Sequence, residues 1–210
     1  MNVRKAISTA AFTAFALFSV GAAQANVITG HLWHVPEIVT FAAIPANVPG
    51  TTPDVVFDVN SPMNFSGTNA TVGTWLASSG AFNLIENTAG TLASLMDDGV
   101  LGTILEFTGF VTVTTGQTFT VTHDDGLTLI IGGLDLGFNP GPTAPVTTTA
   151  TYTGPTGTFA FQLVYAECCG GPAVLQIDLP FSNAVPEPAT LALLGIGLAG
   201  LGFARRRKLN

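Results

Sequence analysis

The chain has 210 residues, of which 47% are hydrophobic, and a formal net charge of −7 at pH 7. Its six Lys and Arg residues lie at the two ends, at positions 4–5 and 205–208, whereas all thirteen acidic residues except Glu187 lie between Asn26 and Val185. Nucleic-acid phosphates are bound by Lys and Arg, so this charge distribution argues against a nucleic-acid partner. It favours hard divalent cations that take oxygen ligands, since the acids have no basic side chain near them in sequence.

The N-terminus reads as a removable export signal. Arg4 and Lys5 form a positive segment, residues 6–21 are apolar apart from small hydroxyl residues, and Ala23-Gln24-Ala25 fits a signal-peptidase site. We therefore predict a signal peptide over residues 1–25; an uncleaved N-terminal anchor helix is the alternative. Export would place the mature chain in an oxidising compartment.

Residues 26–183 are expected to form one all-β domain. Apolar and polar residues alternate in short runs separated by Gly, Pro and Asp turns, which is typical of an antiparallel β-sandwich. A helical spacing is found only at 84–96, where Gly90 interrupts it. Within residues 34–80, the sequence predicts one clear strand and long loops. The expected strands are 55–59, 105–113, 119–123, 127–131, 147–152, 159–165 and 175–179.

The turn Asp124-Asp125-Gly126 is the candidate site in this body. Neighbouring residues of a strand point to opposite faces, so the two carboxylates can reach one ion only if the backbone turns sharply between them. Asp and Gly also favour plain β-turns, so a purely structural turn is an open alternative. His123 shares the face of Phe119 and Val121, which favours a core or site-rim histidine over a general base.

The order of these elements resembles the protective-antigen-type β-sandwich and the related fibro-slime domain. The resemblance rests on residues 107–133, where one strand ends in Asp-Asp-Gly and the next in Gly132-Gly133, and on the hairpin 161–177. It extends over residues 28–180. In sugar-binding members of that family the Asp pair, joined by a cis peptide bond, holds calcium, and calcium holds sugar hydroxyls.

The resemblance implies a calcium ligand set for this chain. Asp124 and Asp125 match the family's Asp pair, and the loop 166–171 matches a second ligand loop that follows a Tyr. That loop has Glu167-Cys168-Cys169 where the family has an Asn, and Glu167 can still offer oxygen. Three interpretations stay open: a turn alone, calcium without sugar, and calcium-assisted glycan binding. Cys168 and Cys169 could form a vicinal disulfide, an intermolecular bridge or two buried thiols.

The C-terminus reads as a sorting signal over residues 184–210. Pro186, Glu187 and Pro188 precede the apolar segment 189–204, which we predict as a transmembrane helix, and Arg205, Arg206 and Arg207 follow it. Sixteen helical residues span roughly 24 Å, short for a hydrocarbon core of about 30 Å. The basic end should stay cytoplasmic, which fixes the body outside. A generic tail anchor is the alternative.

This tail resembles the PEP-CTERM sorting signal. The resemblance implies cleavage by an exosortase-type membrane protease, for which Pro186, Glu187 and Pro188 would be substrate determinants. It further implies a precursor anchored in the inner membrane of a Gram-negative-type bacterium, then transfer to the cell surface or extracellular matrix. Proteins with this signal are associated with extracellular polysaccharide.

The sequence favours a non-enzymatic protein. It contains no nucleophile elbow, zinc-protease motif, phosphate loop or dinucleotide fingerprint. We expect a surface protein that contributes to the polysaccharide or biofilm matrix, with calcium as its one candidate cofactor and extracellular polysaccharide as a candidate partner. The alternative is a secreted glycan-active hydrolase.

Overall fold

The computed structural model describes residues 27–87 and 96–180. The expected signal peptide and the sorting tail, including Pro186 to Pro188 and the Arg cluster, fall outside these ranges. Within them no helix is both long and apolar enough to cross a membrane.

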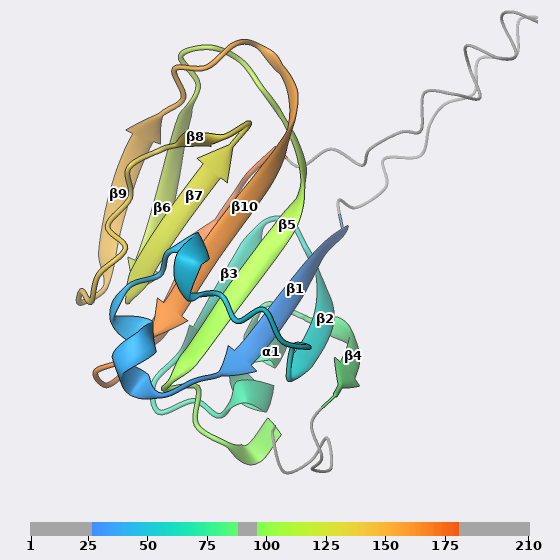
Figure 1. The fold of residues 1–210 in the computed structure, drawn as a ribbon, viewed down its shortest axis with the longest axis vertical. Coiled ribbons are helices and arrows are strands. Elements are labelled where there is room, and N and C mark those ends of the chain that lie inside the picture. Colours follow the sequence, from blue (N-terminus) through green and yellow to red (C-terminus); the bar gives the residue numbers. More distant parts are fainter. Residues whose placement is uncertain (1–26, 88–95, 181–210) are drawn as a thin grey trace, which may run out of the picture.

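Two antiparallel sheets make up the body, as the alternation predicts (Figure 1). The seven-stranded sheet contains, in spatial order, β4 (Phe82–Glu86), β2 (Val55–Asn60), β1 (Val27–His34), β5 (Thr103–Val113), β10 (Gly157–Glu167), β7 (Gly126–Ile131) and β8 (Leu134–Asp135). The four-stranded sheet contains β3 (Met63–Gly67), β11 (Ala173–Ile177), β6 (Thr118–Asp124) and β9 (Val146–Thr151).

One hydrophobic core is shared by the two sheets. Alternate residues of the predicted strands are buried: Phe107 and Val111 on β5 face the same core as Phe119 and Val121 on β6. The longest pairing in the molecule joins β5 and β10 from Val113 and Gly157 to Thr103 and Glu167. Because strands such as β2, β5 and β6 bury alternate residues, the period of two read from the sequence corresponds to real burial there.

The sequence predicted no helix at 72–78, and this was wrong. Helix α1 (Val72–Ser78) begins at Thr71, whose side chain accepts from the Thr74 N–H while the Thr74 hydroxyl accepts from the Thr71 N–H. This reciprocal cap satisfies backbone donors that the first turn leaves free. Two short 3₁₀ turns, η1 (Glu37–Phe41) and η2 (Pro45–Asn47), were also missed. The body is thus mostly β, with α1 and two further α-helical residues, Met96 and Asp97, in the described ranges.

The helical spacing at 84–96 does not produce a helix at its start. Leu84 lies in β4, which pairs with β2. Most of the remaining window, 88–95, lies outside the described residues.

Several connections between the two sheets meet at one end of the body. The β6–β7 turn passes from the four-stranded to the seven-stranded sheet, and the β10–β11 loop passes back. The pairings Asp124 with Val174 and Gly126 with Ala166 bring these two connections side by side. The segment before β9 arrives at the same end, since Val146 pairs with His123. This end holds the candidate site.

Candidate functional site

Asp124 and Asp125 lie where the chain leaves one sheet for the other. The peptide bond between them is cis. Both residues are 3% exposed, and both line one cavity of about 400 Å³. The rest of the wall comes from loop residues 142–145 and 169–172. The structure therefore places the two carboxylates of the predicted pair on a single cavity.

The Asp125 carboxylate joins two loops. Its Oδ1 accepts from the Thr143 N–H at 3.0 Å and its Oδ2 from the Cys168 N–H at 2.8 Å. A carboxylate oxygen can accept more than one hydrogen bond or also bind an ion, so both oxygens keep capacity for a ligand. Asp125 thus fixes the loop before β9 and the β10–β11 loop around the cavity.

Gly126 is required by the close approach of another loop. A Cβ at this position would collide with the Pro140 carbonyl oxygen. That oxygen accepts from the Ala43 N–H at 2.8 Å, and the neighbouring Asn139 carbonyl accepts from the Leu127 N–H at 2.8 Å. The third residue of Asp-Asp-Gly therefore lets the 136–145 segment pack against the start of β7.

His123 is a core residue, which is one of the two roles that the sequence favours for it. It is 0% exposed, and its ring meets Phe138 edge to face at 6.4 Å. Nδ1 lies 2.6 Å from the Asp125 carbonyl oxygen, so this nitrogen carries the proton and donates. His123 therefore supports the backbone of the Asp pair from the core side.

The Asp pair concentrates negative charge that no basic residue neutralises. Burial raises the pKa of Asp124 to about 6, and the adjacent Asp125 carboxylate adds to this by charge and by hydrogen bonding. No Lys or Arg occurs between Asn26 and Val185. Two neighbouring carboxylates in such surroundings are stabilised by sharing a proton or by binding a cation.

Tyr165 connects the Asp pair to Glu167. The Tyr165 hydroxyl donates to the Asp124 carbonyl oxygen. Because a phenol has one proton, the 2.5 Å contact between Tyr165 Oη and Glu167 Oε2 needs its proton from Glu167. Burial raises the pKa of Glu167 to about 9, and the charges of Asp125 and Asp124 reinforce this rise. Glu167 is thus a neutral acid in the folded protein at pH 7.

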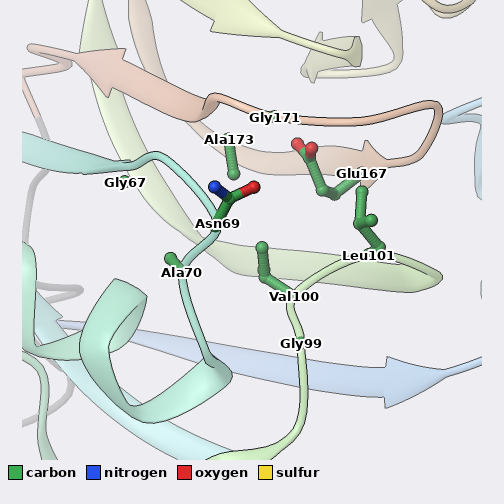
Figure 2. Close-up of a pocket in the computed structure, with 9 residues that line it drawn as sticks. All are labelled: Gly67, Asn69, Ala70, Gly99, Val100, Leu101, Glu167, Gly171 and Ala173. Carbon is green, nitrogen blue, oxygen red and sulfur yellow. The ribbon is translucent and has the colours of Figure 1, made fainter.

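The carboxyl of Glu167 borders a different cavity from the two aspartates. This second cavity measures about 240 Å³, and Figure 2 shows the residues that line it. Gly171 of the β10–β11 loop lines both cavities. Of the expected calcium ligands, the structure brings Asp124 and Asp125 onto one cavity and holds Glu167 behind them. Glu167 reaches the pair through Tyr165 and through the backbone of Asp125.

Cys168 and Cys169 form a vicinal disulfide, one of the three expected alternatives. Their sulfurs and an Asp125 carboxylate oxygen lie within 4.8 Å of one another. Disulfide sulfurs are not thiolates, so this grouping is a poor match for zinc. The oxygen donors available are two carboxylates and the carbonyls of the surrounding loops. Such a set fits calcium, which takes six to eight oxygen ligands.

Sequence reasoning missed the parts that position the pair. The segment 139–145 reads as a Pro/Gly loop, and nothing in its residues shows that the Thr143 N–H bonds Asp125. The contact of Tyr165 with Asp124 could not be predicted either, because the sequence marks this Tyr only as the residue before the second loop. The Thr143 N–H and the Tyr165 hydroxyl can be recognised as donors to the Asp pair only in the folded structure, where three segments distant in sequence meet.

Solved structures share this fold, and two of them are PA14 domains. The PA14 domain of the MpAFP antifreeze protein superposes with a TM-score of 0.55 and 19% identity, covering 76% of this chain and 83% of its own. The PA14 sugar-binding domain from an RTX adhesin gives 0.54 and 20% identity, with 74% and 89% covered. The body thus has a PA14-type β-sandwich fold, as the protective-antigen-type resemblance implied.

The C-terminus carries the PEP-CTERM protein-sorting motif, matched over residues 184–208. This confirms the resemblance read from Pro186, Glu187, Pro188 and the Arg cluster. The motif implies an exported, membrane-anchored precursor that an exosortase processes and that is then sorted to the cell surface. No curated protein matches the chain.

Proposed function

We propose that this chain is a non-enzymatic, surface-sorted glycan-binding protein. Asp124 and Asp125 hold calcium in the 400 Å³ cavity, and the ion in turn holds hydroxyl groups of a sugar. The loops 142–145 and 169–172 supply backbone carbonyl oxygens and shape the mouth. The neighbour from an RTX adhesin, described as a sugar-binding domain, supports this assignment.

The observation that carries the proposal is that the two carboxylates are adjacent, buried and open to the same cavity. They are adjacent, each is 3% exposed, and they open on one cavity in a body that contains no Lys or Arg. Burying paired carboxylates without a counter-charge is unfavourable, and a bound divalent cation removes the penalty. Tyr165 and Glu167 act behind the pair by holding the Asp124 carbonyl.

The hydrolase alternative draws no support from this arrangement. A glycosidase places two carboxyl groups about 5 Å or more apart on either side of the scissile bond. Asp124 and Asp125 are instead hydrogen-bonded neighbours on one wall. This arrangement favours ion binding over acid and nucleophile roles.

The sorting tail sets the biological context of the proposal. The exported body, released near Pro186 to Pro188, would act in the extracellular polysaccharide or biofilm matrix of a Gram-negative-type bacterium. The high negative charge of the body keeps it soluble and favours neutral or cation-bridged glycans as partners.

Glycan binding by the full chain tests the proposal. The protein, held in a detergent without sugar groups, is applied to a panel of bacterial polysaccharides in calcium and in chelator. We expect binding in calcium that chelator and the double variant Asp124→Asn, Asp125→Asn abolish. The matched control Asp97→Asn, Asp98→Asn alters the exposed second Asp-Asp-Gly and should bind normally. Binding that is independent of calcium and of Asp124 and Asp125, or turnover of a polysaccharide, would contradict it.

A further inference from the structure

A second cavity shares one lining residue, Gly171 of the β10–β11 loop, with the cavity of the Asp pair. It measures about 240 Å³ and has apolar walls from Ala70, Val100, Leu101 and Ala173. Figure 2 shows two polar side chains at this space, the Asn69 carboxamide and the Glu167 carboxyl. They come from distant parts of the chain, the β3–α1 loop and the end of β10.

Glu167 leaves one oxygen without a partner at this cavity. The residue is 0% exposed, and Oε1 is buried with no hydrogen bond. Tyr165 engages Oε2, so Oε1 is left as the free acceptor oxygen of the carboxyl. Buried polar atoms are almost always hydrogen-bonded, and an exception calls for an explanation such as a ligand. The missing partner is an N–H or O–H donor.

The size of the cavity limits its occupant to a small group. Pockets that hold drug-sized ligands measure roughly 300–1,000 Å³, so this space takes a single substituent and not an oligosaccharide. The apolar walls favour an uncharged occupant, because burying a charge beside them is costly. The occupant must combine an apolar face for Val100 and Ala173 with one donor for Glu167 and one acceptor for the Asn69 amide.

We propose that this cavity binds an acetamido group, the N-acetyl substituent of an amino sugar. The methyl group packs on the apolar wall, the amide N–H donates to Glu167 Oε1, and the carbonyl oxygen accepts from the Asn69 side chain. An acetamido group supplies each of these features in one planar unit. A hydroxyl group alone would satisfy Glu167 and leave the apolar wall uncovered.

The position of the cavity makes it a neighbour of the calcium site. Gly171 lines both spaces, and a Cβ there would approach the Asn69 backbone nitrogen to 3.3 Å. A sugar held by its hydroxyls at Asp124 and Asp125 could therefore place a substituent across the loop. This link between the two spaces rests on the proposed function, whereas acetamide binding in the cavity does not.

Saturation-transfer NMR on the full chain, in a detergent without sugar groups, tests the inference. The probes are N-acetylglucosamine, glucose and N-methylacetamide, each with calcium and with chelator. We expect the acetyl methyl protons to receive the strongest saturation. N-acetylglucosamine should bind roughly tenfold or more tightly than glucose, the scale of one well-placed apolar group.

Three variants locate the binding. Glu167→Gln keeps a donor toward Tyr165 and an acceptor toward the cavity, and should retain methyl saturation. Glu167→Met removes the acceptor and should weaken N-methylacetamide binding roughly two- to tenfold. Leu101→Ala, at a 48% exposed position of the rim, should also weaken it. Ile85→Ala, at a 57% exposed position on β4, is the matched control and should change nothing.

The outcomes separate this inference from the proposed function. If glucose and N-acetylglucosamine bind equally well in calcium and Glu167→Met changes neither, the calcium site stands and the acetamido site is refuted. If no sugar binds but N-methylacetamide saturates in a Glu167- and Leu101-dependent way, the cavity assignment stands and the proposed function fails. N-methylacetamide signals that all variants leave unchanged would mean that the probe binds elsewhere, and would refute the acetamido site.

Discussion

Glu167 is connected to both the candidate site and the hydrophobic core through hydrogen bonds and ring contacts of Tyr165. Its acid proton is donated to Tyr165, the Tyr165 proton is donated to the Asp124 carbonyl, and the Tyr165 ring stacks on Trp75 at 5.6 Å. Trp75 in turn donates from its indole nitrogen to the Ala173 carbonyl at 3.2 Å. Ionising Glu167 would place a second oxygen acceptor against the Tyr165 hydroxyl, which has only one proton to give.

The first prediction concerns pH and Glu167. Burial raises its folded-state pKa from 4.5 to about 9, so the folded state holds a proton that the unfolded state has lost. The free energy of unfolding should therefore fall as the pH rises from about 5 to 9, approaching ~1.4 kcal/mol per pH unit from this group. Urea denaturation in chelator at several pH values measures this.

Glu167→Gln should remove that part of the pH dependence, because the amide keeps the shape and donor without titrating. Asp97→Asn, at an exposed acid, is the control and should leave the slope as it is. A Gln variant with the same pH profile as the original protein would show that Glu167 is ionised in the folded state.

Residue identity allowed the candidate site to be found only in part. Asp124 and Asp125 stood out because they match the Asp pair of the protective-antigen-type family at the end of a strand. Glu167 was grouped with them because it lies in the loop that matches the family's second ligand loop. It could not show that Glu167 is buried beside a second cavity, because burial there depends on Ala70, Val100 and Leu101 from other segments.

At the scale of elements, the short helix α1 protects an edge of the four-stranded sheet. Strand β3 is the first strand of that sheet and would otherwise present free backbone donors. The Ser78 hydroxyl oxygen accepts from the Ser66 N–H at 2.9 Å, and the Ser79 oxygen accepts from the Asn64 N–H at 2.8 Å. Two side chains at the helix end thus replace the missing neighbouring strand.

The second prediction is that these two serines stabilise β3. Ser78→Ala and Ser79→Ala should each lower the free energy of unfolding by ~1 kcal/mol, the net value of one hydrogen bond. Amide exchange at Ser66 and Asn64 should accelerate. Ser66→Ala, which alters an exposed side chain on β3 and keeps its N–H, serves as control. Unchanged exchange in the Ser78 and Ser79 variants would rule out this edge protection.

The predictable elements were those whose own residues alternate. Strands β5, β6, β7 and β10 carry large apolar residues at most inward positions, with Gly109 as an interruption in β5. Strand β1, which was not predicted, also has a glycine facing the core, Gly30, where a Cβ would collide with the Phe57 ring. Helix α1 has only seven residues, and its cap is recognisable only when Thr71 is seen to precede a buried Trp75. These signals depend on partners distant in sequence.

At the scale of the whole molecule, the sign of the charge distinguishes the two terminal targeting segments from the body. The basic residues belong to the two terminal segments, and the body between them carries acids alone. Removing both termini in the mature protein would leave a strongly acidic domain with no internal salt bridge to Lys or Arg. Cations, whether bound at a site or screening the surface, should therefore matter more for this body than for an average domain.

The third prediction concerns the sorting motif at residues 184–208. Glu187→Ala, or deletion of Arg205, Arg206 and Arg207, should leave the full-length protein unprocessed in the inner membrane. Cell fractionation and the mass of the intact protein measure this. Asp178→Ala, at an exposed acid upstream of the motif, should be processed normally. Normal release of the Glu187 variant would argue against exosortase handling.

Thermal unfolding in calcium, compared with monovalent salt of equal ionic strength, tests the central claim most directly. A ligand that binds only the folded state stabilises it by roughly 2.7 kcal/mol at a hundredfold excess over its dissociation constant. The full chain should melt higher in calcium than in the matched salt, and Asp124→Asn with Asp125→Asn should abolish that difference while Asp97→Asn with Asp98→Asn keeps it. A calcium-specific shift that persists in the Asp124 and Asp125 double variant, or that is absent from the original protein, would reduce the pair to a structural turn.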